Sequence, residues 1–278
     1  MNSKTIVITG ATSGIGEVAA IRLAERGAHV VAVARDAARA EALLAKLRKA
    51  NPREDHTAHL GDLSRLADVR RVSREILETA PVIDVLINNA GAILGKREIT
   101  ADGLEKTFAL NHMAYFVMTN MLLSHIKAGG RIVSTSSEAH RRGEMDFDDL
   151  QFKKGFSPWA SYCRSKLENI LFTRALSRRL VGTGITANTF HPGFVATRFG
   201  DSAGGLHAMG ISFAKMAAIK PEEGAKTLIY LASSPDVKDV SGRYFIKCEI
   251  AAPASAALEV DAAEKLWEIS ANIAGLPA

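Results

Sequence analysis

The stretch Thr5-Ile-Val-Ile-Thr-Gly10-Ala-Thr-Ser-Gly14-Ile-Gly16 places an apolar run directly before a glycine-rich turn and the start of a helical pattern. Glycines in this context let the turn close and let the backbone approach a pyrophosphate, while the helix N-terminus offers unpaired N–H groups and a positive dipole end. A purely structural turn is the alternative. The residues predicted to bind a dinucleotide here are Gly10, Thr12, Ser13, Gly14, Ile15 and Gly16.

Apolar, strand-like runs alternate with helical periods along the chain, which is typical of a parallel sheet covered by helices on both faces. The expected strands are Thr5–Thr9, His29–Ala34, Thr57–Leu60, Val82–Asn88, Arg131–Thr135, Thr186–Phe190 and Arg243–Phe245. The expected helices are Gly16–Arg26, Ala37–Lys49, Ser64–Thr79, Ala101–Lys127, Pro158–Val181 and Pro221–Ser233. We therefore expect an α/β fold, a single-domain Rossmann fold with a seven-stranded parallel, doubly wound sheet in the order 3-2-1-4-5-6-7.

No linker or repeat divides the chain, so we expect residues 1–278 to form one domain, with a dinucleotide-binding core at about 1–197 and 221–250. Glycines among apolar residues predict a mobile substrate lid at about 198–220, with a plain surface excursion as the alternative. A C-terminal helix at about 259–274 is expected to pack in the core or against another subunit, in a homodimer or homotetramer.

Bulk properties are those of a soluble globular protein. The formal charge is +5 and the Lys and Arg residues are spread along the chain, so no nucleic-acid partner is expected. Two cysteines and the absence of metal-ligand spacing predict a reducing compartment and no metal site. No apolar run reaches the ~20 residues of a membrane span. We expect a cytoplasmic protein without a signal peptide.

Tyr162 and Lys166 lie one helical turn apart in the run Ser161-Tyr-Cys-Arg-Ser-Lys166. The pKa of a free phenol is about 10, too high for easy proton exchange at neutral pH. A neighbouring ammonium favours the phenolate, so we expect Lys166 to lower the pKa of Tyr162. Combined with the glycine turn, this pair predicts hydride transfer to or from a nicotinamide, with Tyr162 as general acid/base.

Arg35 directly follows the second expected strand, where the adenosine ribose of a dinucleotide would lie. An acid at this place binds the ribose 2′-OH of NAD, whereas a guanidinium suits the 2′-phosphate of NADP. We therefore predict NADP(H) as cofactor over NAD(H). Asp36 is the residue that could instead turn toward the ribose.

Two further segments follow strands and face the expected cofactor site. Asp62 and Leu63, after the third strand, are predicted to hold the adenine edge, although Asp62 could equally cap the next helix. Small and amide residues after the fourth strand let the backbone lie against the cofactor and also stabilise the turn. These residues are Asn89, Ala90 and Gly91.

The order of these motifs resembles the short-chain dehydrogenase/reductase family over essentially the whole chain. The matching segments are Thr9–Gly16, Gly61–Leu63, Asn88–Gly91, Leu110–His112, Ser134–Ser137, Tyr162–Lys166 and His191–Val195. Within the family, the sequence is similar to the retinol-dehydrogenase-like branch. The segments that carry this closer similarity are Ala34–Asp36, Ser136–His140, Asn169–Thr173, Leu266–Ser270 and Gly275–Pro277, with the long gap from Ser137 to Tyr162.

The resemblance implies a role for each matching residue. Tyr162 would be the general acid/base, Lys166 would also hold the nicotinamide ribose, and Ser137 would bond the substrate oxygen. The backbone of Asn111 would bind a water that connects Lys166 to solvent. The residues that would anchor the carboxamide and the diphosphate are Pro192, Gly193, Val195 and Thr197.

The sequence thus predicts an NADP(H)-dependent oxidoreductase that interconverts an alcohol and a carbonyl. Aromatic and methionine residues near the site predict a fairly bulky, apolar substrate, such as a retinoid, steroid-like, lipid-derived or polycyclic carbonyl. These residues are Phe147, Phe152, Phe156, Trp159, Phe199, Met209, Phe213 and Met216. The alternatives are a non-catalytic dinucleotide sensor or scaffold, which would usually lack the Ser, Tyr or Lys, and a nucleotide-sugar epimerase, which has a different glycine spacing.

Overall fold

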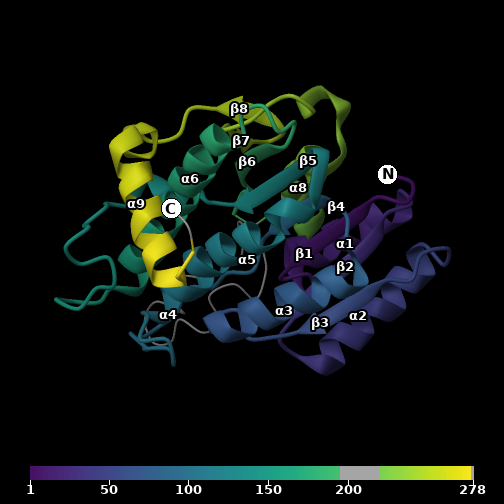
Figure 1. The fold of residues 1–278 in the computed structure, drawn as a ribbon, viewed down its shortest axis with the longest axis horizontal. Helices are drawn as coiled ribbons and strands as arrows, with labels where there is room; N and C mark the ends of the chain where they lie inside the picture. The colour runs from purple at the N-terminus through teal and green to yellow at the C-terminus, as the bar shows by residue number, and fades with distance from the viewer. Residues whose placement is uncertain (195–218, 277–278) are drawn as a thin grey trace.

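The computed structural model describes residues 1–194 and 219–276, and within them one sheet has the strand order β3-β2-β1-β4-β5-β6-β7-β8 (Figure 1). The strands are β1 (Thr5–Thr9), β2 (His29–Ala34), β3 (Thr57–Leu60), β4 (Ile83–Asn88), β5 (Ile126–Thr135), β6 (Thr186–His191), β7 (Tyr244–Ile246) and β8 (Glu249–Ala251). The order reverses between β1 and β4, so the carboxyl ends of these two strands flank the crevice in which ligands of such sheets bind.

The predicted order of seven parallel strands is confirmed, and an eighth strand is added to it. β8 runs antiparallel to β7 and pairs Ala251 with Tyr244. The two-residue turn between the strands, Lys247 and Cys248, has positive φ at both positions, 50° and 66°. This is the conformation that a tight hairpin requires, but asparagine and glycine are its usual residues, so the turn carries no obvious signal in the sequence.

Helices cover both faces of the sheet (Figure 1). They are α1 (Gly14–Glu25), α2 (Ala37–Ala50), α3 (Leu66–Thr79), α4 (Lys106–Phe108), α5 (Ala114–Leu122), α6 (Pro158–Arg179), α8 (Pro221–Ser233) and α9 (Val260–Ala274). Because side chains alternate along a strand, Ile6 and Ile8 pack into the core with α1, α2 and α8, whereas Val7 packs into the core with α3, α5 and α6.

The single helix expected over Ala101–Lys127 is wrong. The helix begins at Lys106, because the Glu105 carboxylate accepts hydrogen bonds from the N–H groups of Thr107 and Phe108 (2.9 and 3.0 Å). A π-helical turn, η1 (Ala109–Met113), separates α4 from α5, and Leu123–His125 forms a 3-10 turn, η2, that leads into β5. The helical spacing of apolar residues continues through all these elements, so the sequence pattern does not indicate where the π-helical and 3-10 turns lie.

The C-terminal helix α9 packs across α5 and α6. The Trp267 ring stacks on Phe172 with 5.8 Å between ring centres and meets Phe116 edge-on at 4.9 Å. Around this aromatic contact, Glu264 forms ion pairs with Arg178 and Arg179 of α6. In the described part of the chain, no helix is long and apolar enough to cross a membrane.

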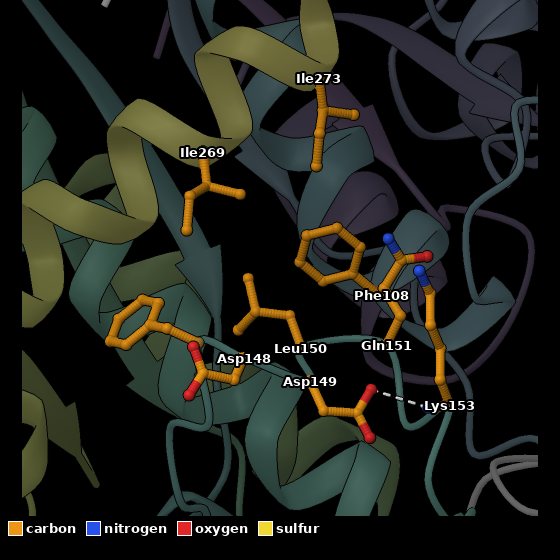
Figure 2. Close-up of a pocket in the computed structure, with 9 residues that line it drawn as sticks. Phe108, Asp148, Asp149, Leu150, Gln151, Lys153, Ile269 and Ile273 are labelled. Carbon is orange, nitrogen blue, oxygen red and sulfur yellow. Dashed lines mark hydrogen bonds between the residues drawn. The ribbon is translucent and has the colours of Figure 1, made fainter.

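A pocket of about 340 Å³ lies between α9, α4 and the segment before α6 (Figure 2). Ile269 and Ile273 of α9 line one side of it, and Leu150 lines the other. At its polar edge, the Asp149 carboxylate accepts a hydrogen bond from the N–H of Lys153 (2.7 Å). Its lining is Phe108, Phe147, Asp148, Asp149, Leu150, Gln151, Lys153, Ile269 and Ile273, which includes none of the predicted catalytic residues.

We predict that Trp267→Ala lowers the free energy of unfolding by about 3–5 kcal/mol, because truncating a buried tryptophan loses its transfer free energy and leaves a cavity. The side chain of Trp159, the other tryptophan, is 46% exposed, so Trp159→Ala should change stability by less than about 1 kcal/mol. Urea denaturation of the two variants measures both effects. Equal losses would contradict the packing described for α9.

Candidate active site

The glycine turn is fastened to the end of β4. The Thr9 hydroxyl accepts hydrogen bonds from the N–H groups of Asn89 (2.9 Å) and Ala90 (3.0 Å). In return, the Asn89 side chain donates to the carbonyls of Thr9 (3.1 Å) and Gly10 (3.2 Å). A Cβ atom on Gly10 would lie 2.9 Å from the Ala90 Cα, and φ of Gly10 is 67°, so only glycine fits there. The turn and the end of β4 therefore form one backbone surface.

The N-terminus of α1 opens from this surface. Ser13 occupies the N-cap position, but its side chain makes no capping hydrogen bond to α1. The Thr12 side chain is half-buried and that of Ser13 is exposed, so both hydroxyls can reach a ligand. Unpaired N–H groups of the first turn and the helix dipole make this end suitable for a phosphate.

The acid next to Arg35 is engaged elsewhere. The Asp36 carboxylate accepts a hydrogen bond from the N–H of Arg39 (2.8 Å) and so caps the N-terminus of α2. Arg35 is exposed at the carboxyl end of β2, next to the buried Ala34. The geometry thus leaves a guanidinium, rather than a free carboxylate, at the position that follows β2.

The capping alternative for Asp62 is wrong. Its carboxylate accepts hydrogen bonds from the N–H (3.0 Å) and the hydroxyl (2.8 Å) of Ser64 and so stabilises a local turn. α3 begins at Leu66, two residues later than expected, and the N–H of Leu66 donates to the distant Asp102 carboxylate (2.9 Å). A cap that lies 36 residues away leaves no pattern near the helix. Leu63, the other residue predicted to hold the adenine edge, is buried in the core.

Three predicted catalytic side chains meet beyond the end of β5. Ser137 follows that strand, and its side chain is hydrogen-bonded with the Tyr162 phenol of α6. The Lys166 ammonium lies 5.6 Å from the centre of the Tyr162 ring and donates to the Thr135 carbonyl (3.1 Å). Ser136 in turn donates to the Lys166 carbonyl (2.8 Å), which fixes α6 against β5. The structure therefore brings Ser137, Tyr162 and Lys166 into one site.

Burial dominates the protonation of this site. It raises the pKa of Tyr162, and the hydrogen bond with Ser137 only partly opposes that effect. The lowering that we expected from Lys166 is thus wrong for the protein alone. Burial also lowers the pKa of Lys166 to about 7, because an ammonium loses hydration inside the protein.

Asn111 lies in the π-helical turn η1 rather than in a regular helix. Its side chain accepts from the N–H of Ala92 (3.0 Å) and donates to the carbonyl of Ala92 (3.0 Å) and to Ser165 Oγ (3.0 Å). A Cβ atom on Gly91 would lie 3.2 Å from Asn111 Oδ1 and 3.5 Å from Lys166 Nζ. Gly91 thus lets the segment after β4 pass close to both side chains.

The expected apolar lining of the substrate site divides into separate groups. The Trp159 ring lies 5.9 Å from that of Tyr162. The Arg164 guanidinium stacks on Phe152, which also contacts Phe156, whereas Phe147 lines the pocket between α9 and α4. Phe199, Met209, Phe213 and Met216 lie outside the described residues, as do Val195, Thr197 and residues 198–218 of the expected lid.

Phe194 and Ile219, the residues on either side of the segment that is not described, lie next to each other. The N–H of Ile219 donates to the Phe194 carbonyl (2.8 Å). Gly193 has a φ of 87°, and a Cβ atom there would lie 2.6 Å from Ile219 Cδ1, so glycine is required. Pro192 and Gly193 therefore lie in the irregular segment directly after β6, at the carboxyl edge of the sheet that also carries Ser137.

Comparison with known proteins identifies the family. Residues 4–204 match the family model described as short chain dehydrogenase. The chain belongs to the short-chain dehydrogenase/reductase family. It is 41% identical to retinol dehydrogenase 14 and 38% identical to retinol dehydrogenase 13 of Homo sapiens, over 99% of this chain in both cases and 88% and 86% of those proteins. It therefore belongs to the retinol-dehydrogenase-like branch and is an oxidoreductase of CH–OH groups.

Solved structures share the fold. An uncharacterized protein from Mycobacterium paratuberculosis matches with a TM-score of 0.79 and 30% identity over 100% of this chain and 96% of its own. A short chain dehydrogenase from Burkholderia cenocepacia, in complex with NADP, matches with a TM-score of 0.71 and 28% identity over 88% of this chain and 96% of its own. Among residues 1–194 and 219–276, no His, Cys, Asp or Glu residues cluster as a metal site would require.

Sequence reasoning missed several polar residues around the site. Thr9 and Thr135 look like ordinary strand residues, although they bond Asn89 and Lys166. Glu168, two residues beyond Lys166, is buried on another face of α6. Burial raises the pKa of Glu168 to about 8, an effect that Arg164 opposes and Glu105 strengthens. A buried carboxyl has no distinctive spacing, so only the fold shows it.

We predict that Glu168 makes stability fall as pH rises. Its pKa is about 8 in the folded protein against a reference value of 4.5, so between these values the folded state binds more protons than the unfolded state. The stabilisation is therefore complete below about pH 4.5 and is lost as the pH approaches about 8. Glu168→Gln should remove this dependence and become more stable than the wild type at alkaline pH, as measured by urea denaturation.

Glu264→Gln is the matched control. Its ion pairs with Arg178 and Arg179 lower the pKa of Glu264 against the effect of burial, so this carboxylate contributes stability at neutral pH that is lost in acid. At neutral to alkaline pH, the free energy of unfolding should therefore be higher than that of the wild type in Glu168→Gln and lower in Glu264→Gln. A stability difference for Glu168→Gln that does not vary with pH would contradict the assignment.

Proposed function

We propose that the protein is an NADP(H)-dependent oxidoreductase that interconverts an alcohol and a ketone or aldehyde on a bulky, apolar substrate. The observation that carries the proposal is the meeting of Ser137, Tyr162 and Lys166 next to the glycine turn and the end of β4. A proton donor, a second hydrogen-bond donor and an amine at one backbone surface are the groups that carbonyl reduction requires.

The residues around the turn fit a nicotinamide dinucleotide. The crowded glycines at 10 and 91 let a ligand lie directly on the backbone, and the first turn of α1 supplies N–H groups for a diphosphate. Lys166, held by the Thr135 carbonyl, would bind the nicotinamide ribose. Bound NADPH would supply the hydride. The proposed cofactor residues also include Thr12, Ser13, Ile15, Leu63, Asn89, Ala90, Pro192, Val195 and Thr197.

The chain's own residues would handle the proton. Ser137 and Tyr162, which are hydrogen-bonded with each other, would both donate to the carbonyl oxygen of the substrate. Because burial raises the pKa of Tyr162, the phenol holds its proton at neutral pH and can donate it to the oxygen as negative charge develops there. In the other direction, the phenolate would take up the alcohol proton. The backbone of Asn111, in the π-helical turn, would bind a water that reconnects Lys166 to solvent.

Two observations support the choice of cofactor, and two support the substrate class. Asp36 caps α2, which leaves the exposed Arg35 as the charged group for a 2′-phosphate, and NADP is bound to the Burkholderia relative. Trp159 beside Tyr162 offers a flat apolar surface, and relatives of this chain are named retinol dehydrogenases. We therefore infer a retinoid-like substrate class. The lid, a homo-oligomer and a cytoplasmic location stay predictions from the sequence.

Tyr162→Phe should lower kcat for NADPH-linked reduction of all-trans-retinaldehyde by at least about a hundredfold, because general acid catalysis contributes about that much. NADPH affinity, measured by fluorescence titration, should stay nearly unchanged, since only the transferable proton is lost. Tyr230→Phe on α8, which packs in the opposite core, is the matched control and should keep full activity. Most of the activity surviving in Tyr162→Phe would refute the acid/base role.

Arg35→Ala should erase a preference for NADPH over NADH that we expect to be about tenfold to a hundredfold, the size of one or two charge-assisted hydrogen bonds. The loss should appear as weaker use of NADPH rather than better use of NADH. Arg48→Ala, at the far end of α2, should leave the preference intact. Values of kcat/KM for both cofactors decide the question, and equal efficiency of the wild type with both would retire the NADP assignment.

A further inference from the structure

His140 is fully buried in the 3-10 helix η3 (Glu138–Arg142), which begins immediately after Ser137. Its Nδ1 lies 2.6 Å from the Ser137 carbonyl oxygen, and its Nε2 lies 3.0 Å from the backbone nitrogen of Ala254. A carbonyl oxygen only accepts and a backbone N–H only donates, so Nδ1 carries the proton and Nε2 accepts. One neutral tautomer satisfies both contacts.

The backbone around Ser137 is held from several sides. The N–H of Glu138 donates to His191 Nδ1 at the end of β6 (3.2 Å), and the N–H of Ala139 donates to Ser137 Oγ (3.2 Å). Tyr244 of β7 donates to the Glu138 carboxylate (2.8 Å), and its ring meets His140 edge-on at 5.0 Å. The Ser137 carbonyl also accepts the backbone N–H of His140 (3.0 Å), and the imidazole of His140 adds a side-chain bond to the same oxygen.

Such support matters because a short 3-10 helix has poor intrinsic hydrogen-bond geometry. The position of Ser137 Oγ depends on the backbone from which it projects. That oxygen must meet the Tyr162 phenol and the substrate oxygen together. A displacement of about 1 Å in a positioning contact can cost about a hundredfold in rate.

We propose that His140 is a positioning residue for the reduction: its imidazole donates to the Ser137 carbonyl and so sets where Ser137 Oγ stands relative to Tyr162, while the Ala254 N–H selects the tautomer in which Nδ1 is the donor. This inference rests on the proposed function. The segment after β8 contacts η3 at a second point, where Arg141 donates to the Ala252 carbonyl (2.7 Å).

Two amide substitutions separate the two contacts. In His140→Asn the amide nitrogen takes the place of Nδ1, so the bond to Ser137 is kept and the bond to Ala254 is lost. In His140→Gln the amide oxygen takes the place of Nε2, so the bond to Ala254 is kept and the side-chain bond to Ser137 is lost, while the backbone bond from residue 140 remains. Each variant thus removes one hydrogen bond of the same buried side chain, and a merely structural role would affect both alike.

The test measures kcat, KM for NADPH and thermal midpoint with NADPH and all-trans-retinaldehyde. We expect kcat of His140→Gln to fall about tenfold or more, and His140→Asn to stay within about threefold of the wild type. KM for NADPH should be unchanged in both, and their thermal midpoints should be similar. Equal losses of kcat, or losses that follow the thermal midpoint, would overturn the proposal.

Amide hydrogen exchange gives a readout that needs no turnover. The Ala139 amide, which donates to Ser137 Oγ, should exchange faster in His140→Gln, and the Ala254 amide should exchange faster in His140→Asn. Equal Ala139 exchange in the two variants would overturn the proposal even with an inactive enzyme. If the two variants show the expected exchange but the wild type does not reduce retinaldehyde, the result would instead count against the proposed function.

Discussion

The buried ammonium of Lys166 and its hydrogen bond to the Thr135 carbonyl hold the candidate site together. Asn169 donates to the same carbonyl (3.1 Å), so the last residue of β5 anchors two successive turns of α6. A buried amine needs such a partner, because leaving it unpaired would cost several kcal/mol. This anchor places Tyr162, one turn earlier on α6, over Ser137, and it leaves Lys166 Nζ next to Gly91.

A second set of hydrogen bonds, between Thr9 and Asn89, joins the glycine turn to the end of β4. The order of strands reverses at this place, so the ends of β1 and β4 diverge and leave room for a ligand. Asn89 lies between these strand ends, and the Thr135 hydroxyl donates to its side-chain oxygen (3.3 Å). Thr135 thus contacts both sets of residues: its hydroxyl bonds Asn89 and its carbonyl accepts from Lys166.

The sheet could be predicted from the sequence because β1 and β2 are largely apolar runs with sharp ends, and the bounds of β1, β2 and β3 match the predicted ones. Elements whose ends depend on a distant partner or on an unusual turn could not be predicted. α3 is capped by Asp102, and the Lys247-Cys248 hairpin uses unusual turn residues. In the site, spacing predicted which side chains meet, but not their protonation. The pKa of Tyr162 depends on burial, which no local pattern records.

In the proposed reaction, a hydride passes from the nicotinamide of NADPH to the carbonyl carbon of the substrate at this surface. Isotope transfer tests it most directly: wild-type protein is incubated with NADPH that carries deuterium at the transferable C4 position and with all-trans-retinaldehyde. The alcohol product is then analysed by mass spectrometry. We expect an alcohol with one deuterium on the carbinol carbon, transferred from one face of the nicotinamide only. An alcohol without the label, or no alcohol under conditions in which NADPH binds, would contradict it.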